Sequence, residues 1–575
     1  MKQYKDQHTI EKRIRWILFF FFTVMLILVV RLFIVQVVEG EKYRAYADRQ
    51  QGARSAIETP RGSVFATNKD GEKIPLASNR LYKNIILAPN RVVDQDRVVR
   101  AVSEAAGVLP EDVESRLQKK DDPYEIAAKK LVLTDEVANA LEAIPGVILE
   151  DDIRRVYPYG SLGARFLGFV AGDDGREEGK YGLERFYDEF LSGSAGLFSG
   201  VADARGFFLA LGRKIIQSSR GGSDVYLTID YNIQDRAQRA LEAAAEKWEA
   251  SSGSVLVIEP ATGRILAMDA IPSYNPNEFN KERDLSIFLN PVVESVYEPG
   301  SVMKPVTMAS ALEEKKVTPE TTYTDYGFVR VRDREIKNFD GKARGVQTMT
   351  QVLEKSLNTG AVHIAKLLGQ EKQKEYIQKF GFGEKAGIDL PGELASNIEN
   401  LLRGHEVEYA TASFGQGIAV TPLQMALAMG AIANNGKLVK PYIVESVRAD
   451  DTVLLENIPE VRREVISPAT AETLTRMLVT AVQNGFVEKR PSLNGYFIAA
   501  KTGTAEIPRR DGKGYSDETI HTLIGYAPAF EPRFLIYLEL GEPKLGRFSS
   551  LTLATAFYDL TEYMLNYYEI PPNRK

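Results

Sequence analysis

The chain of 575 residues contains no cysteine, four histidines and only two tryptophans. The absence of cysteine excludes disulfides, thiol nucleophiles, iron–sulfur clusters and cysteine-based zinc sites. The four histidines are widely separated and show no H-E-x-x-H spacing, which argues against a histidine metal site. Basic residues do not predominate either, since 72 Lys and Arg face 78 Asp and Glu, for a net charge of −6. Such a chain lacks the electrostatic signature of nucleic-acid binding, so we expect no nucleic-acid partner.

A long apolar run extends from residue 16 to residue 38 and is interrupted only by one Arg and one Gln. As a helix it would be about 35 Å long, enough to cross a hydrocarbon core of about 30 Å. Basic residues outnumber acidic ones in segment 1–15, which predicts a cytoplasmic N-terminus and an extracytoplasmic remainder. A cleaved signal peptide is the alternative, but the run is long and the charged segment 39–44 follows it directly. The run therefore predicts an uncleaved, single-pass membrane anchor.

A short polar linker at residues 218–223, Ser-Ser-Arg-Gly-Gly-Ser, is the clearest candidate for a domain boundary. It divides the extracytoplasmic part into a mixed segment, residues 39–222, and a second domain, residues 223–575. The second domain has strand-like patterns near both ends, with helical patterns between them. The predicted strands are 225–229, 254–258, 264–268, 497–500 and 534–538. This arrangement predicts an α+β domain in which one antiparallel sheet carries a helical insertion.

With no thiol and few histidines, the expected nucleophile is a Ser or Thr activated by Lys. Residues 297–305 read Y-E-P-G-S-V-M-K-P, in which a Pro-Gly turn opens a helix with Ser301 at its N-terminus and Lys304 three residues later. Positions i and i+3 share a helix face, so the ammonium of Lys304 can reach the hydroxyl of Ser301. A helix N-terminus also offers free backbone N–H groups to a developing oxyanion. Taken alone, Ser301 is better explained as a helix cap, and Ser-x-x-Lys also arises by chance.

A second motif offers a hydroxyl and an amide, Ser356 and Asn358. Side chains two residues apart cannot share a helix face, so both would enter one cleft only from a turn between helices. The hydroxyl could then shuttle a proton, and the amide could hold a substrate peptide bond. Taken alone, the pattern is also typical of a simple helix cap.

A third motif, Lys501-Thr502-Gly503-Thr504, follows the predicted strand that ends at residue 500. Gly503 leaves the backbone open to close approach, so an extended peptide could pair along it. Lys501 and Thr502 would receive a carboxylate. Taken alone, the tetrapeptide is also explained as a strand that runs into a polar turn.

Together and in this order, Ser-x-x-Lys, Ser-x-Asn and Lys-Thr-Gly form the motif set of the serine penicillin-recognising enzymes. On these motifs the chain resembles the class B penicillin-binding proteins. Further segments similar to this family's anchor exit, pedestal and cleft are Arg31-Leu32, Arg61-Gly62, Arg155–Pro158, Gly182–Glu184, Leu227–Asp230, Phe414–Gly417 and Gly525–Pro528. The D-R-N-G sequence that usually follows Arg61-Gly62 in this family is not clearly present here. The chain also differs from the family's commoner residues at Val302, Met303 and Leu357, which are variable positions of the motifs.

The resemblance implies a peptidoglycan D,D-transpeptidase of the bacterial inner membrane. Its implied parts are the anchor, a pedestal (dimerisation-like) domain and a transpeptidase domain similar to the serine β-lactamases. The implied catalytic residues are Ser301 as nucleophile with Lys304, Ser356, Asn358 and Lys501, and the implied substrate-binding residues are Thr502, Gly503 and Thr504. The implied ligands are stem peptides that end in D-Ala-D-Ala and β-lactam antibiotics, without a metal or cofactor. The implied partner is a glycan polymerase of the SEDS type.

Other enzymes and sensors that recognise penicillin fit the sequence less well. A bifunctional class A protein needs a glycosyltransferase module, and the segment before the linker shows no acidic catalytic motif of that kind. A β-lactamase usually needs a Glu in an E-x-x-L-N motif, which is absent between the second and third motifs. A penicillin-sensing receptor needs several membrane spans and a signalling domain.

Two alternatives remain open within the class B resemblance. One is an elongation-type transpeptidase instead of a septal one, and the other is a catalytically silent penicillin-binding scaffold. Glu298, which precedes the Pro-Gly-Ser sequence, and the chain length are more similar to the septal type. We therefore expect a role in septal wall synthesis during cell division.

Overall fold

A computed structural model describes residues 60–119, 124–172, 177–193, 221–485, 490–509 and 514–573, with two short strands near residues 198 and 214 and a few residues between 22 and 31. The predicted membrane anchor, residues 16–38, lies outside the described residues except for those few. Among the helices that the structure describes, none is long and apolar enough to cross a membrane. The chain separates into two compact units, and the larger one, residues 60–192 with 222–575, contains the predicted site.

The C-terminal part of this unit is built on one antiparallel sheet, as the sequence predicts, but its five strands are not the five predicted ones. The predicted strand 225–229 belongs to another sheet, because it pairs with residues 64–67 and 444–449, and an unpredicted strand at residues 515–527 completes this one. Its strand order is β11-β10-β22-β21-β20. The strands are β10 (Ser252–Ile258), β11 (Ile265–Ile271), β20 (Ala499–Pro508), β21 (Tyr515–Ala527) and β22 (Phe534–Gly541). β20 begins two residues later than predicted, because the backbone of Phe497 bonds instead to Ala529 and to the side chain of Asn573.

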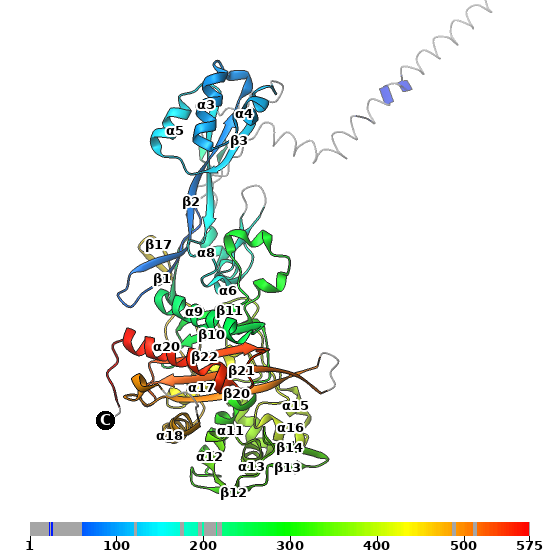
Figure 1. Cartoon of the computed structure of the whole chain (residues 1–575). Helices are drawn as coiled ribbons and strands as arrows, with labels where there is room; N and C mark the ends of the chain where they lie inside the picture. The colour runs from blue at the N-terminus through cyan, green and yellow to red at the C-terminus, as the bar shows by residue number, and fades with distance from the viewer. Residues whose placement is uncertain are drawn as a thin grey trace, which may run out of the picture. The chain divides into compact units, whose positions relative to one another are not determined.

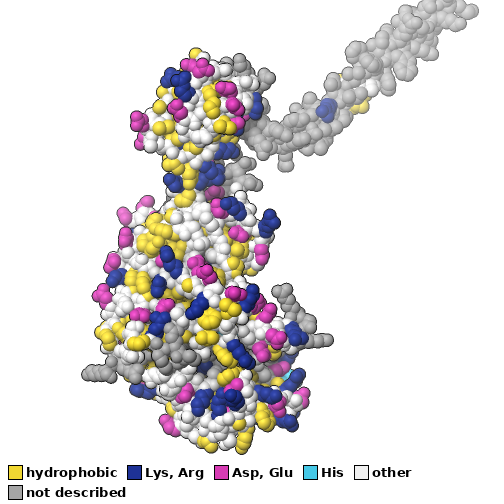
Figure 2. All heavy atoms as spheres, viewed as in Figure 1, with side chains coloured by type: hydrophobic (Ala, Val, Ile, Leu, Met, Phe, Trp, Pro, Cys, Tyr) yellow, Lys and Arg dark blue, Asp and Glu magenta, His cyan; other side chains and the backbone are white. Residues whose placement is uncertain are grey.

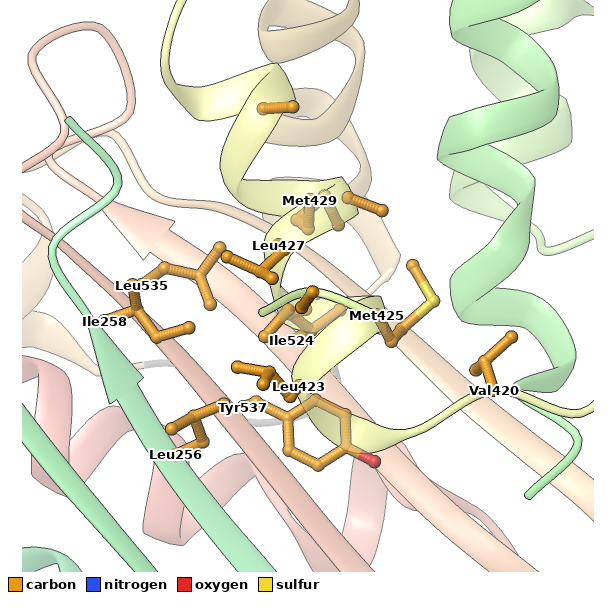
Figure 3. Packing of buried hydrophobic residues seen from close by; sticks show 14 of the residues in the cluster. Leu256, Ile258, Val420, Leu423, Met425, Leu427, Met429, Ile524, Leu535 and Tyr537 are labelled. Atoms are coloured by element: carbon orange, nitrogen blue, oxygen red, sulfur yellow. The ribbon is translucent and has the colours of Figure 1, made fainter. Parts of the chain in front are cut away.

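This sheet is buried on both faces. One face is covered by helices α9 (Tyr231–Trp248) and α20 (Ala554–Tyr567), and the other by helix α17 (Pro422–Ala433) (Figure 1). Side chains alternate between the two layers with a period of two: Val255 and Val257 belong to the first, Leu256 and Ile258 to the second. Figure 3 shows the second layer, where side chains of α17 such as Leu423 pack against the sheet.

Between β11 and β20 the chain inserts a helical region, which confirms the predicted insertion. Its main helices are α11 (Lys304–Glu313), α12 (Met349–Glu354), α13 (Asn358–Leu368), α14 (Gln370–Lys379), α16 (Glu406–Ala412) and α18 (Pro468–Gly485), together with α17. α11 packs against α13, and α18 packs against both α12 and β20. These contacts bring the starts of α11 and α13 and the start of β20 into one region.

A second sheet, of seven strands, forms the N-terminal part of the unit. Its order is β18-β17-β9-β1-β2-β3, and β4 pairs with β2 outside this path. The strands are β1 (Val64–Thr67), β2 (Lys73–Leu87), β3 (Glu125–Leu131), β4 (Val147–Val156), β9 (Asp224–Asp230), β17 (Val444–Ala449) and β18 (Thr452–Glu456). Strands β17 and β18 come from far along the chain, so this sheet crosses the predicted domain boundary at residues 222–223. That boundary stays a prediction.

A small core of its own lies at the far ends of β2, β3 and β4. Helices α3 (Gln95–Ala106), α4 (Pro110–Leu117) and α5 (Asp135–Glu142) pack there against apolar strand residues such as Ile85 and Leu87. On the face shown in Figure 2, basic and acidic side chains of the described residues are interspersed, in agreement with the small net charge.

A buried ion cluster joins β4 and the segment just before β1 to the short helix α7 (Gly182–Phe186). Glu184 is fully buried and accepts hydrogen bonds from Nε of Arg61 and Nε of Arg155, both at 2.7 Å. Arg61 also forms an ion pair of 2.7 Å with Asp188. Because a charge is costly to bury unless it is paired and hydrogen-bonded, the cluster needs both arginines and the glutamate together.

Candidate active site

The candidate nucleophile Ser301 lies in a tight turn before α11, as the sequence predicts. The turn is a short 3₁₀ helix, η5 (Gly300–Met303), and Gly300 adopts φ +58°, a left-handed conformation that favours glycine. The backbone N–H of Gly300 donates to the carbonyl of Gly415 at 3.0 Å, and a Cβ at Gly415 would collide with Gly300. These two glycines let a loop of the helical insertion pack directly against the Ser301 turn.

Lys304, the first residue of α11, is at the centre of the site. Its ammonium nitrogen lies 3.0 Å from Oγ of Ser301 and 3.2 Å from Oγ of Ser356. The same nitrogen donates to the carbonyl of Ser356 at 2.6 Å and to Oδ1 of Asn358 at 2.8 Å. One side chain thus contacts both hydroxyls and the amide of the first two sequence motifs.

Ser356 and Asn358 enter the site from the turn between α12 and α13, as predicted. Ser356 adopts φ +54°, which is unusual for a residue with a side chain. Leu357 between them is fully buried and anchors the turn in the core. The amide nitrogen of Asn358 donates to the carbonyl of Lys337 at 3.0 Å, which directs its oxygen toward Lys304.

Lys501 approaches from the other side, on strand β20. Its Nζ donates to Oγ of Ser356 at 3.0 Å and to the carbonyl of Thr502 at 2.9 Å. The Ser356 hydroxyl is therefore shared by both lysines. The structure thus brings together Ser301, Lys304, Ser356, Asn358 and Lys501, which the sequence places on three separate segments.

The two lysines share an unusual electrostatic environment. Lys304 is 1% exposed and Lys501 is 3% exposed, and within the described part of the chain neither forms an ion pair with a carboxylate. Burial, with the positive charge of Lys501 as a second cause, holds the pKa of Lys304 well below its usual range. Burial alone lowers the pKa of Lys501 to about 7. The site therefore favours a neutral amine beside the Ser301 hydroxyl.

The remaining residues of the third motif line up along β20 at the edge of the sheet. A Cβ at Gly503 would lie 3.0 Å from Cγ1 of Val302 and 3.1 Å from the carbonyl of Pro299, so a glycine permits the close approach of the strand to the nucleophile turn. Thr502 and Thr504 are half-buried on either side of it. Oγ1 of Thr504 accepts from the backbone N–H of Ser549 at 3.2 Å.

Two contributors to this region have no motif in the sequence. Ser549, at the start of helix α19 (Ser549–Thr552), bonds to Thr504 from far along the chain. Glu298 accepts from the backbone N–H of Gly417 at 3.1 Å and from Oη of Tyr515 at 3.0 Å. Glu298 thereby links the nucleophile turn to a loop of the insertion and to β21.

No three His, Asp or Glu side chains of the described residues gather into an arrangement that could hold a metal. A cavity of about 710 Å³ lies elsewhere, among residues that include Lys69, Asp230, Arg264 and Glu445. None of the residues predicted for the site lines this cavity. The chemistry that the site can perform is therefore judged from its hydroxyls and amines: a serine beside a neutral amine is suited to acyl transfer.

Comparison with known families and proteins agrees with this geometry. A family model described as penicillin binding protein transpeptidase domain matches residues 253–562, and one described as penicillin-binding protein dimerisation domain matches residues 56–227. The chain is 32% identical to Stage V sporulation protein D of Bacillus subtilis, over 93% of this chain and 82% of that protein. It is 31% identical to a peptidoglycan D,D-transpeptidase FtsI homolog of Mesostigma viride, over 97% and 96%.

A solved structure shows the same fold. Penicillin binding protein 2X from Streptococcus thermophilus superposes on this chain with a TM-score of 0.78 at 24% sequence identity. The match covers 88% of this chain and 79% of that one. The similarity therefore extends over both the N-terminal sheet and the five-stranded sheet with its insertion.

Proposed function

Because this chain belongs to the class B penicillin-binding proteins, we propose that it is a serine D,D-transpeptidase that cross-links peptidoglycan stem peptides. The observation that carries the proposal is the position of Lys304 Nζ, within hydrogen-bonding distance of the hydroxyls of both Ser301 and Ser356. A buried amine with a lowered pKa is suited to be the general base for an adjacent serine.

In the first step, neutral Lys304 accepts the proton of Ser301 while Oγ attacks the carbonyl carbon of the penultimate D-Ala of a stem peptide. The backbone N–H groups of Ser301 and Thr504 would stabilise the resulting oxyanion. The C–N bond to the terminal D-Ala then breaks, and its nitrogen receives a proton through Ser356. The contacts of Ser356 Oγ with Lys304 and Lys501 support this relay.

In the second step, the amine of a neighbouring stem peptide attacks the ester carbonyl of the acyl-enzyme. The amine loses a proton to the Lys304–Ser356 pair, Ser301 regains its own, and the new amide bond is the cross-link. Donor peptide would lie along β20, the edge strand of the sheet, with its carboxylate near Thr502 and Thr504. Asn358 would hold a peptide bond of the substrate.

β-Lactam antibiotics would acylate the same serine, and this supplies the test. We would incubate the purified full chain with benzylpenicillin, measure the intact mass and map the modified peptide. A stable adduct on the peptide that carries Ser301 is expected. An adduct on a different serine would contradict the assignment of the nucleophile.

A catalytically silent scaffold is the alternative to an enzyme. If benzylpenicillin left the folded chain unmodified, a D-Ala-D-Ala thioester substrate would separate a drug-resistant transpeptidase from such a scaffold. Release of the thiol would support the enzyme, and its absence would support the scaffold. The intact set of Ser301, Lys304, Ser356 and Lys501 favours the enzyme.

For the cellular role, we propose a bacterial inner-membrane protein that is anchored by residues 16–38 and acts with a SEDS-type glycan polymerase in septal wall synthesis. The apolar run and its basic flank support the anchor. Glu298 before the Pro-Gly-Ser turn supports the septal type over the elongation type. Depletion in the native cell tests the role: we expect blocked septation, whereas blocked lateral growth with normal septa would contradict it.

A further inference from the structure

A buried carboxylate outside the proposed catalytic residues lies close behind the Ser356–Asn358 turn. Asp325 ends strand β12 (Thr322–Asp325) and is 0% exposed. Within the described residues it forms no ion pair with a cation. Instead its two oxygens accept hydrogen bonds of 2.8–3.1 Å from four donors, which are the backbone N–H groups of Gly327 and Arg344, Nδ2 of Asn338 and Oγ1 of Thr359.

Asn338 links this carboxylate to the candidate active site through hydrogen bonds. It directly follows strand β14 (Arg334–Lys337), and its Oδ1 accepts from the backbone N–H of Thr359 at 3.2 Å. The carbonyl of the preceding residue, Lys337, accepts from Nδ2 of Asn358 at 3.0 Å. Oδ1 of Asn358 in turn accepts from Lys304 Nζ at 2.8 Å. A continuous path of bonded neighbours therefore runs from Asp325 to Lys304.

We propose that Asp325 is a positioning residue for acyl transfer: through Asn338 it holds the Asn358 amide in the orientation that places Lys304 against Ser301. This inference rests on the proposed transpeptidase function. An amide side chain has two similar orientations, and the carbonyl of Lys337, which can only accept, selects the one in which Nδ2 of Asn358 faces it and Oδ1 faces Lys304. Asp325 keeps that carbonyl in place because it binds both the end of β14 and the first turn of α13.

The chemistry of the four donors requires a carboxylate at position 325. A carboxylate only accepts hydrogen bonds, and every group around Asp325 donates one. In Asp325→Asn the new NH₂ group would face at least one of these donors at nearly unchanged volume. A buried donor without an acceptor is costly, so the segment around Asn338 should shift to relieve it.

The test compares rates of acylation of the purified full chain by benzylpenicillin, well below the melting temperature of each variant. We expect Asp325→Asn to acylate about 10- to 100-fold more slowly than the wild type, because small displacements of catalytic groups have effects of this size. Asp333→Asn, in the exposed turn between β13 (Phe328–Val331) and β14, removes the same charge and should acylate at the wild-type rate.

A reciprocal exchange separates positioning from a general loss of stability. In Asp325→Asn with Asn338→Asp, an NH₂ group again faces a carboxylate, so the double variant should acylate faster than Asp325→Asn alone. If Asp325→Asn does not fold, Asn338→Ala carries the same prediction of slow acylation, since it removes the link and keeps the carboxylate.

Two results would overturn the positioning role: a folded Asp325→Asn or Asn338→Ala chain that acylates at the wild-type rate, or a double variant no faster than Asp325→Asn. If benzylpenicillin does not acylate the wild-type chain, the same variants are compared by thiol release from the D-Ala-D-Ala thioester, and failure of the wild type in both assays would count against the proposed function instead. The two failures are therefore distinguishable in one series.

Discussion

Two clusters of buried basic side chains in this chain differ in whether they contain an anion. Near the N-terminal sheet, Arg61 and Arg155 surround the carboxylate of Glu184. In the candidate active site, Lys304 and Lys501 are equally buried, yet within the described residues they bond only to hydroxyls, amides and carbonyls. Burial disfavours the charged form of the basic side chains in both clusters, so the two clusters differ electrostatically because only one of them contains an anion.

The effect on protonation is correspondingly different. Burial by itself would lower the pKa of Arg61, but Glu184 and Asp188 outweigh it and the pKa is raised. No anion offsets burial at the lysines, and their pKa values are lowered. The first cluster therefore keeps its charges and joins segments together, whereas the second favours the neutral amine that a base requires. Four experiments would break or sharpen this contrast.

The largest effect is expected from Ser301→Ala. Acylation by benzylpenicillin should disappear, because the alanine has no hydroxyl to attack the lactam carbonyl. The melting temperature should stay close to that of the wild type, since the ion cluster around Glu184 is untouched. Intact mass measures the acylation, and calorimetry measures the melting temperature. Full-rate labelling of the alanine variant would refute the assignment of Ser301.

Lys304→Met should lower the acylation rate at least 100-fold, the usual contribution of a general base. The apolar side chain also removes a buried amine that has no counter-ion, but it leaves the carbonyl of Ser356 and Oδ1 of Asn358 without this donor, so a moderate loss of stability is expected. Stopped-flow acylation and urea unfolding give the two quantities. A variant that retains more than a tenth of the wild-type rate would show that another group accepts the proton.

Glu184→Gln should have the opposite effects, a large loss of stability and an unchanged rate of acylation. It leaves two buried guanidinium groups without their shared anion, and breaking a buried pair of this kind costs about 3–5 kcal/mol of unfolding free energy. Acylation of the folded fraction should keep its wild-type rate constant. Asp188→Asn is the matched control, because Asp188 is 35% exposed and, among the residues that the structure describes, forms an ion pair only with Arg61, so its effect should be smaller. Equal losses in both variants would contradict the central role of Glu184.

The smallest effect is expected in the pH dependence of the unfolding free energy. The pKa of Lys501 is about 7 in the folded chain, whereas the ordinary pKa of a lysine is 10.5. Between these values the unfolded chain binds a proton that the folded chain does not, so stability should rise with pH, by up to about 1.4 kcal/mol per pH unit. Urea unfolding at pH 7, 8 and 9 should show this rise to be reduced in Lys501→Met. Parallel curves for the two proteins would mean that Lys501 is charged when folded.

Several parts of the fold were predictable because their signals are local. The hairpin of β10 and β11 has turn residues at its tip, and Asp230 caps α9 by accepting from the N–H groups of Asn232 and Ile233. The Pro-Gly turn before Ser301 and the three-residue spacing to Lys304 likewise depend only on neighbours in the sequence.

Other parts had no local signal. The helical segment near the C-terminus is divided into α19 and α20 at Leu553, which has a non-ideal backbone at φ −109°. Strand β17 pairs with both β18 and β9, and its pairing with β9 of the N-terminal sheet joins two segments that are far apart in the chain, so it leaves no mark in either segment. Ser549 and Asp325 belong to no motif, so only their contacts reveal them. The sequence singles out Glu298, but only the structure shows that it bonds to Gly417 and Tyr515.

By itself, the sequence determined which residues carry the chemistry and on what kind of element each lies, because turn formers, caps and residue spacing act over a few positions. Only the tertiary structure decided that the three motifs meet around one hydroxyl, that of Ser356, and that the lysines beside it are buried without an anion. The physical reason is that burial and pairing depend on residues far apart in the chain, and the pKa of a lysine is set by those surroundings.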